Sequence, residues 1–158
     1  MQKFKAYLPL IAGVILIIAT FMIFLPGVIQ KTPNPLGGDF TVDYSGLQVV
    51  FGQAENPKLE FNVGVFIGWV FMFGAGVVSL IGALNKKLGV LVFVGVGVAI
   101  VGSVLVFLEA VFFKSANDFS SIFNTTYNLG IGPILGGIFG IIGTASAGYA
   151  GFKALLSE

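Results

Sequence analysis

The sequence LGIGPILGGIFGIIGTASAGYAGFKAL, residues Leu129–Leu155, contains a single charged residue, Lys153, close to its end. The hydrocarbon core of a bilayer is about 30 Å thick, and a helix of about 20 apolar residues crosses it. The stretch is long enough to cross the bilayer and has few polar side chains that water would solvate. It therefore predicts a membrane-spanning helix.

Three further apolar stretches of similar length precede it, at Tyr7–Ile29, Phe61–Leu84 and Leu88–Phe113. Within a bilayer only helices and closed barrels satisfy every backbone hydrogen bond. The sequence thus predicts an all-α membrane protein, an antiparallel four-helix transmembrane bundle that forms one domain over residues 1–158. Two outer segments, about 30–60 and 114–128, connect the helices on one side.

The composition supports this class and excludes several functions. Of 158 residues, 56% are hydrophobic and only 9% are charged, whereas soluble domains carry about 25% charged residues. The net charge of +1 gives no nucleic-acid footprint. The chain has no Cys and no His, which excludes disulfides, thiolate or imidazole metal sites and a Ser–His nucleophile. We expect no enzymatic activity, no catalytic residue, no cofactor and no bound metal.

Lysine positions predict the orientation, because cytoplasmic loops are richer in Lys and Arg. Five lysines fall on the side of the two termini and three on the other: Lys3, Lys5, Lys86, Lys87 and Lys153 against Lys31, Lys58 and Lys114. We expect a multi-pass plasma-membrane protein with both termini in the cytoplasm. The first stretch could also be a signal peptide, but its length and the absence of a small-x-small cleavage site favour an anchor that is retained.

Glycines recur at four-residue spacing in two of the stretches. These are Gly64 and Gly68 in the second stretch, and Gly132, Gly136, Gly140 and Gly148 in the fourth, where Thr144 occupies the intervening position. Small residues at this spacing let a neighbouring helix approach closely. The stripe either packs within the bundle, which we favour, or forms a face for dimerisation or a partner.

Glu109 is the one acidic residue inside an apolar stretch. An intramembrane carboxylate suggests an ion or proton site. Because Glu109 lies near the outer end of the third stretch, we favour an interfacial carboxylate that contacts water or the outer loops. It is nevertheless the candidate ion or polar site.

The first outer segment has β character. Phe40, Val42 and Tyr44 alternate with polar residues, Leu47–Phe51 is also β-prone, and Ser45-Gly46 can turn the chain between them. We predict a small extracellular β-hairpin that either caps its own bundle or recognises a partner, with Tyr44, Leu47 and Phe51 as candidate partner contacts. The second outer segment predicts a short amphipathic helix on which Phe119, Ile122 and Phe123 share a face.

This layout, together with Gly46-Leu47 in the outer strand region, resembles the claudin and peripheral myelin protein architecture of four spans. Claudins carry Trp and two Cys in that region, and this chain has neither there. The resemblance implies a four-span fold and a role in contacts between proteins or at the cell surface.

We therefore expect a non-enzymatic interaction, assembly or accessory subunit that acts through its extracellular segment. Its partners would be the lipid bilayer and either another protein or its own copies, and no nucleic acid. The alternative is a component of an oligomeric channel or transporter, with Glu109 near the outer mouth.

Overall fold

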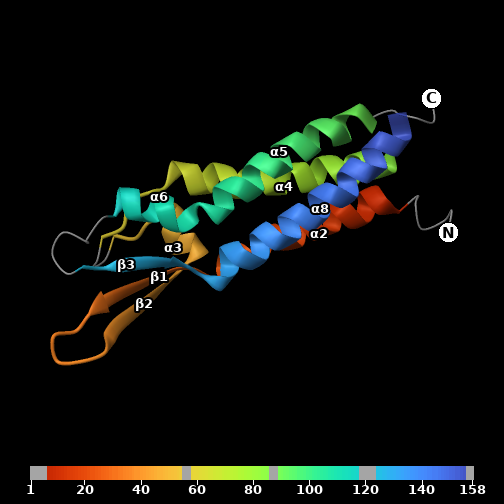
Figure 1. Cartoon of the computed structure of the whole chain (residues 1–158). Helices are drawn as coiled ribbons and strands as arrows, with labels where there is room; N and C mark the ends of the chain where they lie inside the picture. Colours follow the sequence, from red (N-terminus) through yellow and green to blue (C-terminus); the bar gives the residue numbers. More distant parts are fainter. Residues whose placement is uncertain (1–6, 55–57, 86–88, 118–123, 156–158) are drawn as a thin grey trace.

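Four antiparallel helices form the body of the molecule, and a small sheet lies at one end of it (Figure 1). The computed structural model describes residues 7–54, 58–85, 89–117 and 124–155. The helices are α2 (Leu8–Phe21), α4 (Val63–Leu84), α5 (Gly89–Phe107) and α8 (Ile131–Leu155). They pack in a ring in which each helix packs mainly against two others, in the order α2, α4, α5, α8. The start of α2 and the end of α8 lie at the end of the bundle opposite to the sheet (Figure 1).

Two of these helices, α4 and α8, are long and apolar enough to cross a membrane. A third crossing segment results if α5 and the short helix α6 (Glu109–Ala116) are taken as one bent span. The remaining apolar helix, Leu8–Phe24 including its 3-10 turn, is shorter. The described residues therefore contain two or three candidate spans.

The first predicted span, Tyr7–Ile29, is too long. Helix α2 ends at Phe21, a 3-10 turn (η1, Met22–Phe24) follows, and Leu25 is extended. The cause is Pro26, which disfavours helical backbone in the residue before it and has no N–H to donate. The helical structure therefore ends before Pro26, and the chain from Pro26 onward forms a strand.

The sheet has three antiparallel strands in the order β2-β1-β3. They are β1 (Pro26–Pro33), β2 (Asp39–Ser45) and β3 (Thr126–Leu129). A tight turn joins β1 to β2, in which the Asn34 N–H donates to the Gly38 carbonyl and both Gly37 and Gly38 have positive φ. A hairpin is therefore present, but the first half of its first strand, Pro26–Ile29, fell within the predicted first span, and β3 was not predicted.

The second predicted strand, Leu47–Phe51, is wrong. These residues belong to a short helix, α3 (Gly46–Phe51). Ser45 is its N-cap: its hydroxyl accepts from the Gln48 N–H, and the Gln48 side chain accepts from the Ser45 N–H at 2.9 Å. This reciprocal capping box starts a helix where a turn was expected.

The third predicted span also changes direction. Helix α5 ends at Phe107, and α6 leaves it at an angle of 56°. At the bend the Leu108 N–H is shared between the carbonyls of Val104 and Leu105, a bifurcated bond typical of helix ends. The amphipathic helix expected around Phe119, Ile122 and Phe123 lies outside the described residues, as do Lys86 and Lys87.

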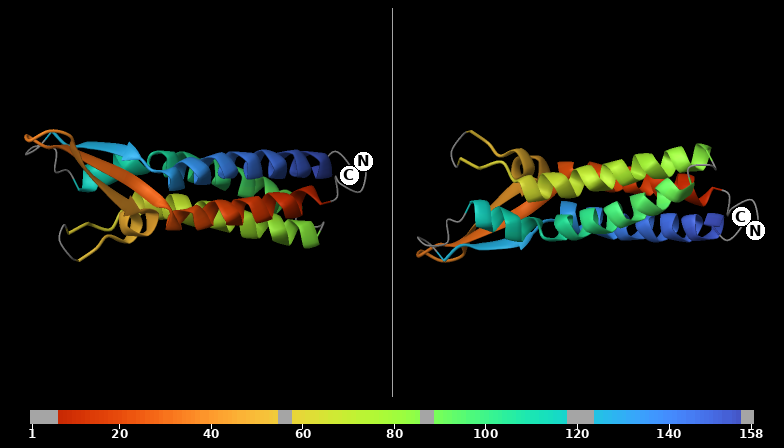
Figure 2. Two further views of the ribbon diagram at one scale, coloured as in Figure 1. Left: turned by 90° about the horizontal axis from the view of Figure 1, so that it is seen from below. Right: turned by 90° about the horizontal axis from the view of Figure 1, so that it is seen from above.

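The main core joins the sheet to the bundle. Val28 and Tyr44 of the sheet, Val49 of α3, Trp69 of α4 and Phe113 of α6 are all buried in one cluster. Figure 2 shows the sheet and the bundle from two further sides, with the β1–β2 hairpin extending beyond the ends of the helices. The sheet is thus fixed at its base and projects at its tip.

Candidate functional site

Glu109 lies at the junction of bundle and sheet. It is the first residue of α6, directly after the bend, and its side chain is 0% exposed. Its Oε2 accepts a hydrogen bond of 3.3 Å from the indole N–H of Trp69 on α4. Of the two environments expected for Glu109, contact with water is wrong, because this side chain is fully enclosed by the protein, whereas contact with the outer segments stays a prediction.

The second carboxyl oxygen of Glu109 has no hydrogen-bond partner. It lies against Gly27, the residue at the irregular register of β1, and a methyl group on Gly27 would overlap it. A buried oxygen without a donor costs about 1–3 kcal/mol. The arrangement leaves one acceptor that can take a proton or a donor group, enclosed by Trp69 and the glycine backbone.

The packing glycines of α4 face other helices of the same bundle. Gly64 faces the ring of Phe112, and a methyl group on Gly68 would lie 2.9 Å from the Leu105 Cβ. At both glycines the neighbouring space is therefore filled by residues of the same chain.

The glycines of α8 vary in how closely they are approached. A methyl group on Gly132 would lie 2.7 Å from the Met22 carbonyl oxygen, and one on Gly136 would lie 2.8 Å from the Trp69 ring. One on Gly140 would overlap the Ser103 hydroxyl, whereas Gly148 has only Val96, at 3.8 Å. Gly136 thus also holds the indole that binds Glu109.

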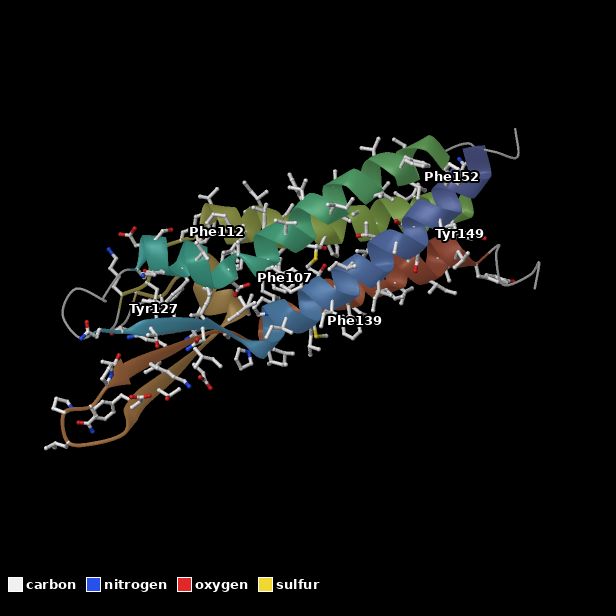
Figure 3. The ribbon with its side chains drawn as sticks, in the orientation of Figure 1. Phe107, Phe112, Tyr127, Phe139, Tyr149 and Phe152 are labelled. Atoms are coloured by element: carbon white, nitrogen blue, oxygen red, sulfur yellow. The ribbon has the colours of Figure 1, made fainter. Side chains whose placement is uncertain are left out.

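A cavity of about 240 Å³ lies between α5 and α8. Phe107 reaches into this region from α5 toward α8 (Figure 3). The two polar residues that line the cavity already have hydrogen-bond partners. The Thr144 hydroxyl donates to the Gly140 carbonyl at 2.7 Å, and the Ser103 hydroxyl donates to the Met72 sulfur. The cavity therefore suits an apolar group. Among the described residues no group of three or more Asp, Glu, His or Cys gathers that could hold a metal ion.

The outer strand β2 presents two different faces. Side chains alternate along a strand, so Asp39, Thr41 and Asp43 form one face, here called the acidic face. Phe40, Val42 and Tyr44 form the opposite, apolar face. Residues 39–43 are all exposed, because the hairpin extends past the helices that cover its base.

The three predicted contact residues differ in accessibility. Tyr44 is only 3% exposed: its ring packs on Phe113 at 5.1 Å, and its hydroxyl donates to the Gln30 side chain at 3.0 Å. Burial raises the pKa of the Tyr44 hydroxyl, which keeps it protonated as the donor. Leu47 is half-buried, and Phe51 is exposed beside Phe61. Tyr44 is therefore a structural residue and not an accessible contact.

No family model matches the chain, and no curated protein is significantly similar in sequence.

Two exposed hairpin residues were not among the predicted contact residues. Phe40 and Val42 are 62% and 44% exposed on the same face as Tyr44, and the alternating sequence Asp-Phe-Thr-Val-Asp at 39–43 carried the signal. The pairing of Trp69 with Glu109 was not predicted, because it joins residues 40 apart that meet only in the folded chain.

Proposed function

We propose that this chain is a four-span membrane protein without enzymatic activity that binds a partner protein through its outer sheet. Every helix of the bundle turns apolar side chains outward, including Val14 and Ile18 on α2 and Ile141 on α8. Such a surface suits lipid and not water. Helix α2 packs directly against α4 and α8, so it shares their surroundings even though it is shorter.

The length of α2 is compatible with crossing. The 17 residues of Leu8–Phe24 rise about 25 Å at 1.5 Å per residue, a few ångströms less than a typical hydrocarbon core. Local thinning of the bilayer accommodates a mismatch of this size at modest cost. We place the sheet outside the cell and both termini in the cytoplasm of a plasma-membrane protein, as the lysine distribution favours.

One observation carries the binding role: β2 is an edge strand whose residues 39–43 are exposed beyond the bundle. Edge strands of this kind are usually covered or kept short, because their free backbone groups pair with other chains. An exposed edge with Phe40 and Val42 beside it is therefore suited to contact another protein.

Photo-cross-linking in native membranes tests this role. A photoreactive amino acid in place of Phe40 is expected to give a discrete protein adduct. The same probe in place of Tyr149, which is 53% exposed on α8, serves as the control on the membrane-facing surface. If position 40 yields no adduct above that control, the proposed binding role is wrong.

A second candidate is a component of an oligomeric channel or transporter. The unpartnered oxygen of Glu109 favours it, since intramembrane carboxylates line many ion and proton paths. Flux of protons or monovalent cations into liposomes, reduced by Glu109→Gln, is the expected result. Flux that is absent from the parent protein at every pH and voltage would remove this candidate.

A further inference from the structure

The free edge of β2 has a defined chemical pattern. Along this edge the N–H and C=O groups of every second residue point away from β1. A partner strand on that side would pair with them. The side chains of Asp39 and Asp43 lie on one side of the strand, the acidic face. Those of Phe40 and Val42 lie on the other side, the apolar face. Neither aspartate has an ion-pair partner among the described residues.

The same pattern disfavours pairing with a second copy of this chain. Two copies aligned antiparallel over the exposed residues 39–43 would be centred on Thr41, so Asp39 of each copy would lie opposite Asp43 of the other. Like charges directly opposite each other on neighbouring strands are destabilising. The edge therefore favours a different partner over itself.

Resting on the proposed binding role, we infer that the edge of β2 takes an extended segment of a partner protein as an added antiparallel strand. The segment carries Lys or Arg opposite Asp39 and Asp43 and apolar residues opposite Phe40 and Val42. This is strand addition, in which main-chain hydrogen bonds give affinity and alternate side chains give specificity. The partner motif is thus five residues long: basic, apolar, any residue, apolar, basic.

The length of the site agrees with this motif. Ser45, at the base of β2, caps α3, and Tyr44 is buried on Phe113, so the added strand ends at Asp43. At the other end the chain turns through Gly37 and Gly38, which limits pairing beyond Asp39. The five exposed residues are the full extent of the edge.

Binding of defined peptides to the full-length protein in detergent micelles tests the inference. The probe is a blocked, fluorescently labelled heptapeptide, Thr-Lys-Val-Thr-Val-Lys-Thr. Its matched control replaces both Lys by Glu and keeps the same apolar content, so micelle partitioning is equal. The Lys peptide is expected to bind about tenfold more tightly at low salt, and this preference weakens at high salt.

Two further variants separate charge from backbone pairing. In the double variant Asp39→Lys/Asp43→Lys, the binding preference is expected to reverse toward the Glu peptide. Both sites are exposed, so an unchanged melting temperature shows that the fold of the variant is intact. A Lys peptide N-methylated at two adjacent central residues loses a donor toward β2 in either register and is expected to bind at least tenfold more weakly. Equal binding of the methylated peptide, or no reversal in the variant, overturns the inference.

These outcomes are distinct from those of the cross-linking experiment. A protein adduct at position 40 with no charge-dependent peptide binding leaves the binding role intact and makes strand addition wrong. The two aspartates then serve only to prevent edge-to-edge association. Absence of the adduct contradicts the binding role itself.

Discussion

A methyl group added to α5 at Gly102 should destabilise the protein, while the same change at Gly97 should not. At Gly102 the new Cβ would lie 2.8 Å from the Gly68 carbonyl oxygen and 3.1 Å from the Met72 nitrogen. Both are backbone atoms of α4, which cannot rotate aside, so the two helices must separate. At Gly97, on the same helix, nothing lies within 4 Å of the added carbon.

The magnitude follows from the difference between the two variants. Replacing a helical Gly by Ala stabilises by about 0.5–1 kcal/mol, and this contribution is common to both sites. Overpacking at Gly102 costs about 1–3 kcal/mol. Gly102→Ala should therefore be less stable than Gly97→Ala by about 1–3 kcal/mol, or about 2–12 °C in melting temperature for a chain of this size.

Thermal unfolding in detergent, followed by the fluorescence of Trp69, measures both variants against the parent protein. Trp69 is the single tryptophan and lies in the main core, so its signal reports loss of helix packing. If Gly102→Ala melts at or above the temperature of Gly97→Ala, the close approach of α4 and α5 is wrong.

Three other changes test separate contacts. Gly140→Leu should cost about 1–3 kcal/mol by overpacking against Ser103 and Met72, whereas Gly148→Leu, with only Val96 nearby, should cost little; equal melting temperatures would contradict this. Trp69→Phe should cost about 1–3 kcal/mol because it removes the donor to Glu109, and Glu109→Met should recover part of that loss. A double-mutant cycle with no coupling would show that the hydrogen bond is unimportant. Ser45→Ala should cost about 0.5–2 kcal/mol and speed amide exchange in α3 but not in α4; unchanged exchange in α3 would argue against the cap.

The helices were predictable because their signal is local. Helix α4 begins at Val63 and α8 at Ile131, each two residues after the predicted start. Composition over 20 residues decides whether a segment suits lipid, and no distant contact is needed for that. Whether the shorter α2 crosses a bilayer depends on its packing and not on its own length.

The sheet was predicted only in part, because its pairing is not local. Alternation in Phe40–Tyr44 correctly predicted β2, but the apolar Val28 and Ile29 of β1 were assigned to the helix before them. Strand β3 is four residues long and pairs with β1 from far along the chain, so its own sequence carries little signal. In contrast, the capping box Ser45-x-x-Gln48 was visible in the sequence and outweighs the β-branched residues that follow it.

Glu109 shows the same limit at the candidate site. Its sequence position in an apolar stretch correctly marked it as unusual, but the bend before α6 turns its side chain inward to Trp69. Forty residues separate the two partners. The sequence gives the position of Glu109 along an assumed straight helix. It does not show that the folded chain encloses the carboxyl group.

Close backbone approach at the junction would favour the binding role proposed for the hairpin. A methyl group on Gly46 would lie 2.6 Å from the Ile23 carbonyl oxygen, and one on Gly132 would lie 2.7 Å from the Met22 carbonyl oxygen. A methyl group on Gly130 would overlap the Pro26 carbonyl. The chain segments around η1, β1, α3 and α8 therefore meet with no side chain between them. A strand held this firmly at its base loses little conformational entropy when a partner binds its free end, and such preorganisation raises affinity without adding contacts. The glycines at the junction would then serve the binding role by fixing the direction in which β2 is presented.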